Sequence, residues 1–134
     1  MKIVYSDAKI GRTAQREVVK DAEAQLIGRR MGEEIDGTLV GLEGYKLRVT
    51  GLSDKSGAPS RREVDGTRKV HVLIHSGAGI GRTSRGERRR KLVRGNTISA
   101  DTEQVNTVIT AYGAKSAEEL FPKKEKAQAE EAKQ

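Results

Sequence analysis

The sequence predicts a mostly β fold of the α+β class: a small six-stranded barrel-like domain with one or two short helices and a charged C-terminal tail. Short segments of alternating apolar and polar residues recur along the chain, glycine-rich turns separate them, and helix signals are few. Hydrophobic residues make up 34% of the 134 residues, and only three Tyr and one Phe are aromatic. The chain should therefore form one domain around a modest, largely aliphatic core.

The first half of the chain is expected to contain three strands and a short helix. Residues 2–6 and 16–20 read as two strands around a turn at residues 8–13 that contains Gly11. Asp21 can cap a short helix whose length Gly28 limits. Residues 45–50 alternate as a strand, and residues 51–60 are predicted to be a loop because they are dense in turn-forming residues.

The second half begins with the clearest strand, residues 68–76, in which Val70, Val72 and Ile74 should point inward. A glycine-rich loop and a basic strand follow, and residues 105–112 form the last predicted strand. Ser116 should start a short helix that ends at Pro122. We therefore expect a single domain at residues 1–122, with a basic strand at 82–95. Residues 123–134, which contain only Lys, Glu, Gln and Ala, should be a frayed helix or disordered.

Positive charge is concentrated in one quarter of the chain. Residues 61–95 hold eleven Lys or Arg against three acids, whereas the remaining fifteen basic residues face sixteen acids. The excess behind the net charge of +7 thus lies in this segment. Such a concentration indicates a surface that binds a polyanion.

The basic segment is rich in arginine, whose planar guanidinium matches phosphate oxygens and stacks on bases better than lysine does. No aromatic residue lies near it in the sequence, so we expect recognition of phosphates and groove shape in folded RNA rather than base stacking on rings. The predicted RNA-binding residues are Arg82, Arg85, Arg88, Arg89, Arg90, Lys91 and Arg94, followed by Lys55, Arg61, Arg62, Arg68 and Lys69.

Two other functions remain open at this point. A nucleotide-binding enzyme could use the loop Gly77–Gly81, although neither the dinucleotide nor the phosphate-loop spacing is complete. A free-standing regulator that binds polyanions transiently would have the same basic segment. We expect no enzyme activity, no catalytic residues and no cofactor or small-molecule substrate. His71 and His75 lack an obvious catalytic partner or further metal ligands, and the chain has no cysteine.

Two sequence blocks resemble the archaeal–eukaryotic family of ribosomal protein six of the small subunit (S-six-e). Residues 51–60 resemble the signature G-G-x-D-x-x-G-x-P-M, with Leu52 and Ser60 as departures, and residues 84–95 resemble R-x-G-E-R-x-R-K-x-V-R-G. Most of the resemblance lies between Leu47 and Ile109.

The resemblance implies an archaeal member with a six-stranded barrel-like fold, acting in translation as a structural constituent of the small subunit ribonucleoprotein. Its partners would be small-subunit ribosomal RNA and neighbouring ribosomal proteins. Neither a signal peptide nor a membrane span is evident, and we expect a ribosomal location in the cytoplasm.

Overall fold

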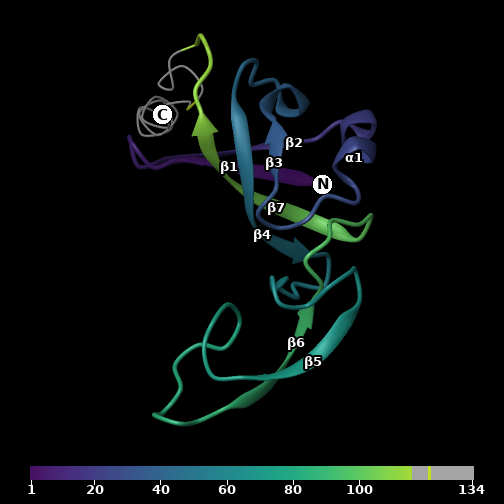
Figure 1. Cartoon of the computed structure of the whole chain (residues 1–134), viewed down its shortest axis with the longest axis vertical. Coiled ribbons are helices and arrows are strands. Elements are labelled where there is room, and N and C mark those ends of the chain that lie inside the picture. The colour runs from purple at the N-terminus through teal and green to yellow at the C-terminus, as the bar shows by residue number, and fades with distance from the viewer. Residues whose placement is uncertain (116–120, 122–134) are drawn as a thin grey trace, which may run out of the picture.

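The computed structural model describes residues 1–115 and 121, in which seven strands form two separate sheets. Five strands form one sheet in the order β2–β1–β7–β4–β3, and β5 pairs with β6 in a two-stranded ribbon that projects from one end of this sheet (Figure 1). The elements in chain order are β1 (Lys2–Asp7), β2 (Arg12–Glu17), α1 (Lys20–Leu26), β3 (Glu34–Asp36), the 3₁₀ helix η1 (Gly37–Val40), β4 (Lys46–Asp54), β5 (Lys69–Ile74), β6 (Arg89–Arg94) and β7 (Thr102–Ala111).

The predicted mostly β class with little helix is confirmed, but the described strands do not close into a barrel. β2 and β3 are the two outer strands of the large sheet and do not pair with each other. β5 and β6 pair only with each other as strands, so the predicted six-stranded barrel is not formed. No helix in the described residues is long and apolar enough to cross a membrane. The predicted helix at Ser116 and the charged tail lie outside the described residues.

The core lies on one face of the five-stranded sheet. Ile3, Leu47, Val49 and Val105 are each 0% exposed, which places alternate residues of three adjacent strands in one interior. Helix α1 and the 3₁₀ helix η1 also place side chains in this core. The residue from η1 is Val40, which is 6% exposed. The core is mainly aliphatic, as predicted, and three of the four aromatic side chains also belong to it.

Several predicted boundaries are wrong for local reasons. Strand β2 starts at Arg12 rather than residue 16, because the turn closes early through a 2.9 Å hydrogen bond from the Gly11 amide to the Asp7 carbonyl. The helix starts at Lys20, and Asp21 lies in its first turn rather than capping it. Strand β4 continues to Asp54 and so includes residues 51–54 of the predicted loop, with a register irregularity between Val49 and Gly51.

The strand β5 is confirmed, but its apolar residues do not enter the main core. Val70, Val72 and Ile74 are only partly buried and face residues of β6 across the ribbon. None of the three belongs to the core cluster of the large sheet. The alternation in the sequence therefore located a strand correctly, but the prediction that these side chains point into the domain core was wrong.

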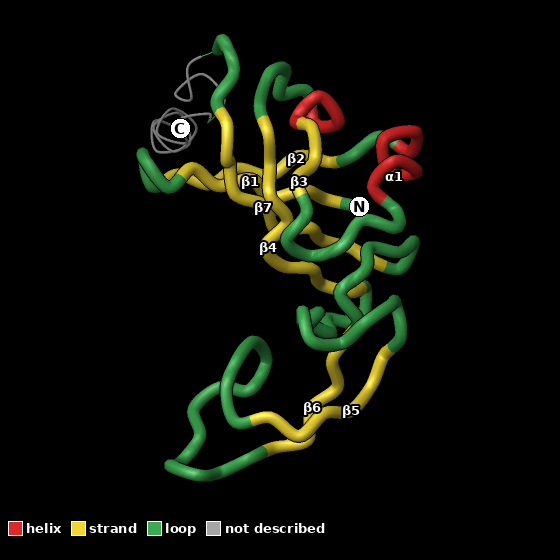
Figure 2. The backbone as a smooth tube through the Cα atoms, viewed as in Figure 1, coloured by secondary structure: helices red, strands yellow, loops and turns green. Residues whose placement is uncertain are grey.

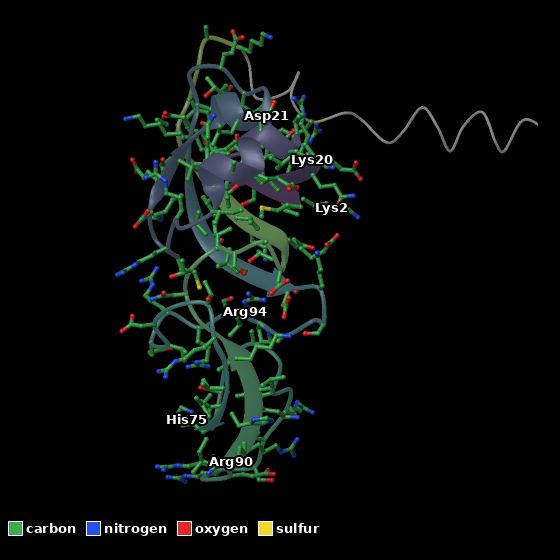
Figure 3. The ribbon with its side chains drawn as sticks, turned by 90° about the vertical axis from the view of Figure 1, so that its right-hand side faces the viewer. Lys2, Lys20, Asp21, His75, Arg90 and Arg94 are labelled. Atoms are coloured by element: carbon green, nitrogen blue, oxygen red, sulfur yellow. The ribbon has the colours of Figure 1, made fainter. Side chains whose placement is uncertain are left out.

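A buried carboxylate joins the ribbon to the large sheet. Asp54, the last residue of β4, is 4% exposed, and it meets both cations at the base of the ribbon. Its Oδ2 accepts a hydrogen bond from Lys69 Nζ at 2.6 Å, and its Oδ1 lies 2.9 Å from Arg94 Nη1. Lys69 begins β5 and Arg94 ends β6, and the two residues are opposite each other in the ribbon. The ion pairs thus hold both strands of the ribbon at one point. Figure 3 shows Arg94 where the ribbon meets the large sheet.

Replacing this carboxylate should destabilise the protein. In Asp54→Asn the Arg94 guanidinium stays buried without its nearest counter-charge, and we expect the free energy of unfolding to fall by about 3 kcal/mol. Asp101→Asn is the matched control, because Asp101 Oδ2 lies 3.7 Å from the same guanidinium but its side chain is 72% exposed. The control should lose less than about 1 kcal/mol. Urea denaturation measures both, and equal losses would contradict a special role for Asp54.

Low pH should remove the contribution of the Asp54 carboxylate to the stability of the fold. Hydrogen bonding from Lys69 lowers the pKa of Asp54 from its usual value of 3.8 to about 2. A lowered pKa in the folded state means that the carboxylate stabilises the fold above pH 3.8 and that this contribution is lost as the pH falls towards 2. The urea midpoint of the wild type should therefore decrease over that interval more steeply than that of Asp54→Asn. Parallel curves would show that Asp54 is not the group that titrates.

Candidate nucleic-acid interface

The β5–β6 ribbon exposes one face, which includes His71, Leu73 and Arg90, and leaves most of the other face partly buried. Its antiparallel register places Val72 opposite Lys91 on one face and Leu73 opposite Arg90 on the other. Residues His75 and Thr83 lie in the loop beyond, where the Thr83 hydroxyl donates a 3.1 Å hydrogen bond to the His75 carbonyl. Figure 2 shows that this ribbon and its loop extend away from the large sheet. The exposed face of the ribbon and its loop are therefore accessible to a large partner.

Most of the predicted RNA-binding cations of the ribbon have no charge partner within the described chain. Two of those at residues 82–94 are exceptions: Arg94 pairs with Asp54, and Arg89 Nε donates a 2.9 Å hydrogen bond to Glu87 Oε1. Because few acids lie nearby, the ribbon presents a concentrated positive charge away from the core. The side chains without an ion pair or hydrogen bond to any described residue are Arg82, Arg85, Arg88, Arg90 and Lys91.

Arg94 differs from the rest of the predicted cluster because its side chain is only 4% exposed. Besides the ion pair with Asp54, its Nη2 donates a hydrogen bond to Ser99 Oγ. The Arg94–Asp54 approach does not have hydrogen-bond geometry, and Arg94 Nε meets no acceptor among the described residues, so Coulomb attraction holds this group. Arg94 therefore stabilises the junction, and its guanidinium is not available at the surface.

The secondary group of predicted cations surrounds the base of the ribbon. Lys69 is held by Asp54 and by a 3.0 Å hydrogen bond to Ser56 Oγ. Arg61 forms a 3.2 Å ion pair with Glu63 and donates a 3.2 Å hydrogen bond to the Ser76 carbonyl, which fixes the start of the distal loop. The exposed residues without such partners in the described chain are Lys55, Arg62 and Arg68.

Two exposed leucines on the ribbon were not among the predicted site residues. Leu73 is 53% exposed and Leu92 is 38% exposed, and their register positions place them on the same face as Arg90. The exposure of Leu73 could have been predicted from the sequence, because in the alternating pattern of β5 it lies on the same side as the polar residue His71. Apolar side chains between cations can pack against sugars or base edges as well as against protein.

The two histidines lie on β5 and in the loop that follows it. His71 and His75 are exposed, and His75 Nδ1 lies 2.9 Å from the hydroxyl of the adjacent Ser76. Within the described residues, no group of three or more His, Cys, Asp or Glu side chains could hold a metal ion.

Comparison with known proteins assigns the chain to a family. The family model described as ribosomal protein S6e matches residues 1–122. The small ribosomal subunit protein eS6 of Methanocella arvoryzae is 47% identical over 125 residues, which cover 93% of this chain and 88% of the relative. Proteins of the same name from Methanocaldococcus jannaschii and Methanothermobacter thermautotrophicus are each 46% identical over 90% of this chain, covering 89% and 94% of the relatives. The predicted resemblance is thus confirmed, and the chain belongs to the ribosomal protein S6e family.

Proposed function

We propose that this chain is a structural component of the small ribosomal subunit and that its β5–β6 ribbon binds ribosomal RNA. The family is one of ribosomal proteins, which agrees with the prediction that the chain is not an enzyme. Its archaeal relatives are named as proteins of the small subunit. The partners in this proposal are small-subunit ribosomal RNA and neighbouring ribosomal proteins.

The observation that carries the RNA-binding proposal is the row of unpaired cations on the ribbon. Like charges at this density repel one another, and phosphates would neutralise them with release of counterions. An arginine such as Arg90 can donate two parallel hydrogen bonds to one phosphate. The mechanism is therefore electrostatic attachment, in which the large sheet fixes where the ribbon points and the ribbon distributes its cations over neighbouring RNA segments.

The ribbon also lacks the packing that would stabilise it alone. An isolated two-stranded hairpin is marginally stable in water, and β5–β6 is joined to the large sheet mainly near its base. RNA on both faces would supply the missing contacts, because Leu73 and Leu92 lie on one face and Lys91 on the other. Binding should thus order the ribbon at the same time as it neutralises its charge.

The main mode of recognition is contact with phosphates and groove shape. All four aromatic residues lie in the large-sheet part of the molecule, and Tyr5, Tyr45 and Phe121 are buried there. The ribbon consequently has no Tyr or Phe ring on which several bases could stack in succession.

Removing unpaired cations should reduce the salt dependence of RNA binding. Changing Arg82, Arg90 and Lys91 to Gln retains the side-chain stems, and the slope of log affinity against log salt should become shallower by roughly one unit for each lost phosphate contact. Filter binding to small-subunit ribosomal RNA over a salt series measures this slope. A matched control changes Arg12, Lys46 and Arg48 to Gln, which removes the same charge from exposed positions on the large sheet. Equal effects of the two triple variants would place the RNA-binding surface elsewhere.

Sedimentation separates a ribosomal protein from a free-standing regulator. A tagged copy of the chain expressed in a methanogenic archaeon should sediment with small subunits at physiological salt, because multiple phosphate contacts together resist dissociation. Immunoblotting of sucrose-gradient fractions is the measurement. If the chain remained at the top of the gradient, the subunit assignment would be wrong and the transient polyanion-binding alternative would be supported.

A further inference from the structure

The distal end of the ribbon contains a hollow of about 410 Å³ between the end of β5 and the segment that leads into β6. Its lining includes His75, Thr83, Arg85, Glu87 and Arg88. The walls are connected, since the Thr83 hydroxyl donates to the His75 carbonyl at 3.1 Å. Figure 3 shows that His75 and Arg90 lie at the end of the molecule remote from the large sheet. The hollow is thus located where the proposed RNA partner would meet the ribbon.

Charges of both signs line this hollow. Arg85 and Arg88 form no ion pair or hydrogen bond with the described residues, whereas Glu87 is held in place by two donors. The Ser84 amide donates to Glu87 Oε2 at 2.9 Å and Arg89 Nε donates to Oε1 at 2.9 Å. The Ser84 hydrogen bond, followed by that from Arg89, lowers the pKa of Glu87, so the carboxylate is ionised at neutral pH. An ionised carboxylate has about four acceptor positions, so positions remain for further N–H donors.

The presence of two arginines and one carboxylate in the hollow favours some ligands over others. A simple anion would be attracted by Arg85 and Arg88 but repelled by Glu87, so the hollow is poorly suited to a lone phosphate. A nucleotide can interact favourably with both kinds of charge. Its phosphate can pair with an arginine, while N–H groups on the edge of its base donate hydrogen bonds to the carboxylate. The His75 imidazole and the arginine guanidinium groups are planar surfaces on which a base can stack.

We propose that this hollow receives one unpaired guanine nucleotide of the bound RNA. Guanine carries two adjacent N–H donors on its Watson–Crick edge, which match the two oxygens of Glu87, whereas adenine and cytosine carry one exocyclic amino group there. Uracil has a single N–H between two carbonyl oxygens, and a carboxylate repels those oxygens. The assignment rests on the proposed RNA-binding function and adds one base-specific contact to an otherwise phosphate-directed surface.

The test compares three RNA decamers that differ at one nucleotide. One is oligouridine with a single central guanosine, one has inosine at that position, and one is uridine throughout. Inosine lacks only the 2-amino group, so it removes one donor without changing the protein. Fluorescence anisotropy with the wild-type chain should show binding to the guanosine decamer that is roughly tenfold tighter than to the other two.

A protein variant tests the same contact between Glu87 and the guanine base. Glu87→Gln should reduce the preference for guanosine over inosine to less than about twofold, because the carboxylate acceptor is replaced by an amide that also donates. The ratio of affinities is the readout, since removing one negative charge strengthens binding to every RNA. Glu17→Gln is the matched control, because it removes the same charge at an exposed position of β2 that is distant in the sequence from the hollow. This variant should retain the preference for guanosine over inosine.

The outcomes separate this inference from the proposed function. Equal binding of the three decamers to the wild type would overturn the guanine site, even where the salt slope on ribosomal RNA still depends on Arg82, Arg90 and Lys91. Loss of that dependence would instead refute the RNA-binding ribbon. GMP that bound as tightly as the guanosine decamer would identify a site for free nucleotides and contradict an RNA ligand.

Discussion

The position of the β5–β6 ribbon depends on one buried carboxylate. Asp54 ends β4 and neutralises the first cation of β5 and the last cation of β6 at the same point. A buried guanidinium such as that of Arg94 would be strongly unfavourable without this counter-charge. Backbone hydrogen bonds act at the same place, since the Arg94 amide donates to the Pro59 carbonyl at 2.9 Å and the Arg61 amide donates to the Arg94 carbonyl at 3.0 Å. The ion pairs and these hydrogen bonds together hold the base of the ribbon beside the end of β4.

The basic segment contains cations in two different situations. Near the base of the ribbon, Lys69 and Arg94 pair with Asp54, and Arg61 donates to the Ser76 carbonyl. Most cations toward the distal end have no ion pair or hydrogen bond to a described residue, and these are the ones that we propose for RNA binding. A run of arginines that looks uniform in the sequence therefore includes both internally paired and unpaired side chains.

The sequence predicted the parts of the fold that local pattern determines. Alternation located β1, β4, β5 and β7, because a strand with one buried face has a period of two residues. It did not reveal β3, which has only three residues, or the continuation of β4 past Gly51, where an irregularity interrupts the alternation. Burial of Arg94 could not be predicted from its neighbours, because the acid that neutralises it is forty positions away and is brought close only by pairing of the strands.

The glycine-rich loop after β5 shows how backbone conformation can require glycines in a pattern that resembles a nucleotide-binding motif. Gly77 has a φ of 125°, and a Cβ at this position would lie 2.5 Å from Arg61 Nη1. Gly79 has a φ of 83° and lies beside the ring of Pro59, and the following residue, Ile80, is 4% exposed. A residue other than glycine would be strained at the positive φ of either position. This backbone requirement accounts for Gly77 and Gly79 independently of the nucleotide-binding motif, whose spacing is incomplete.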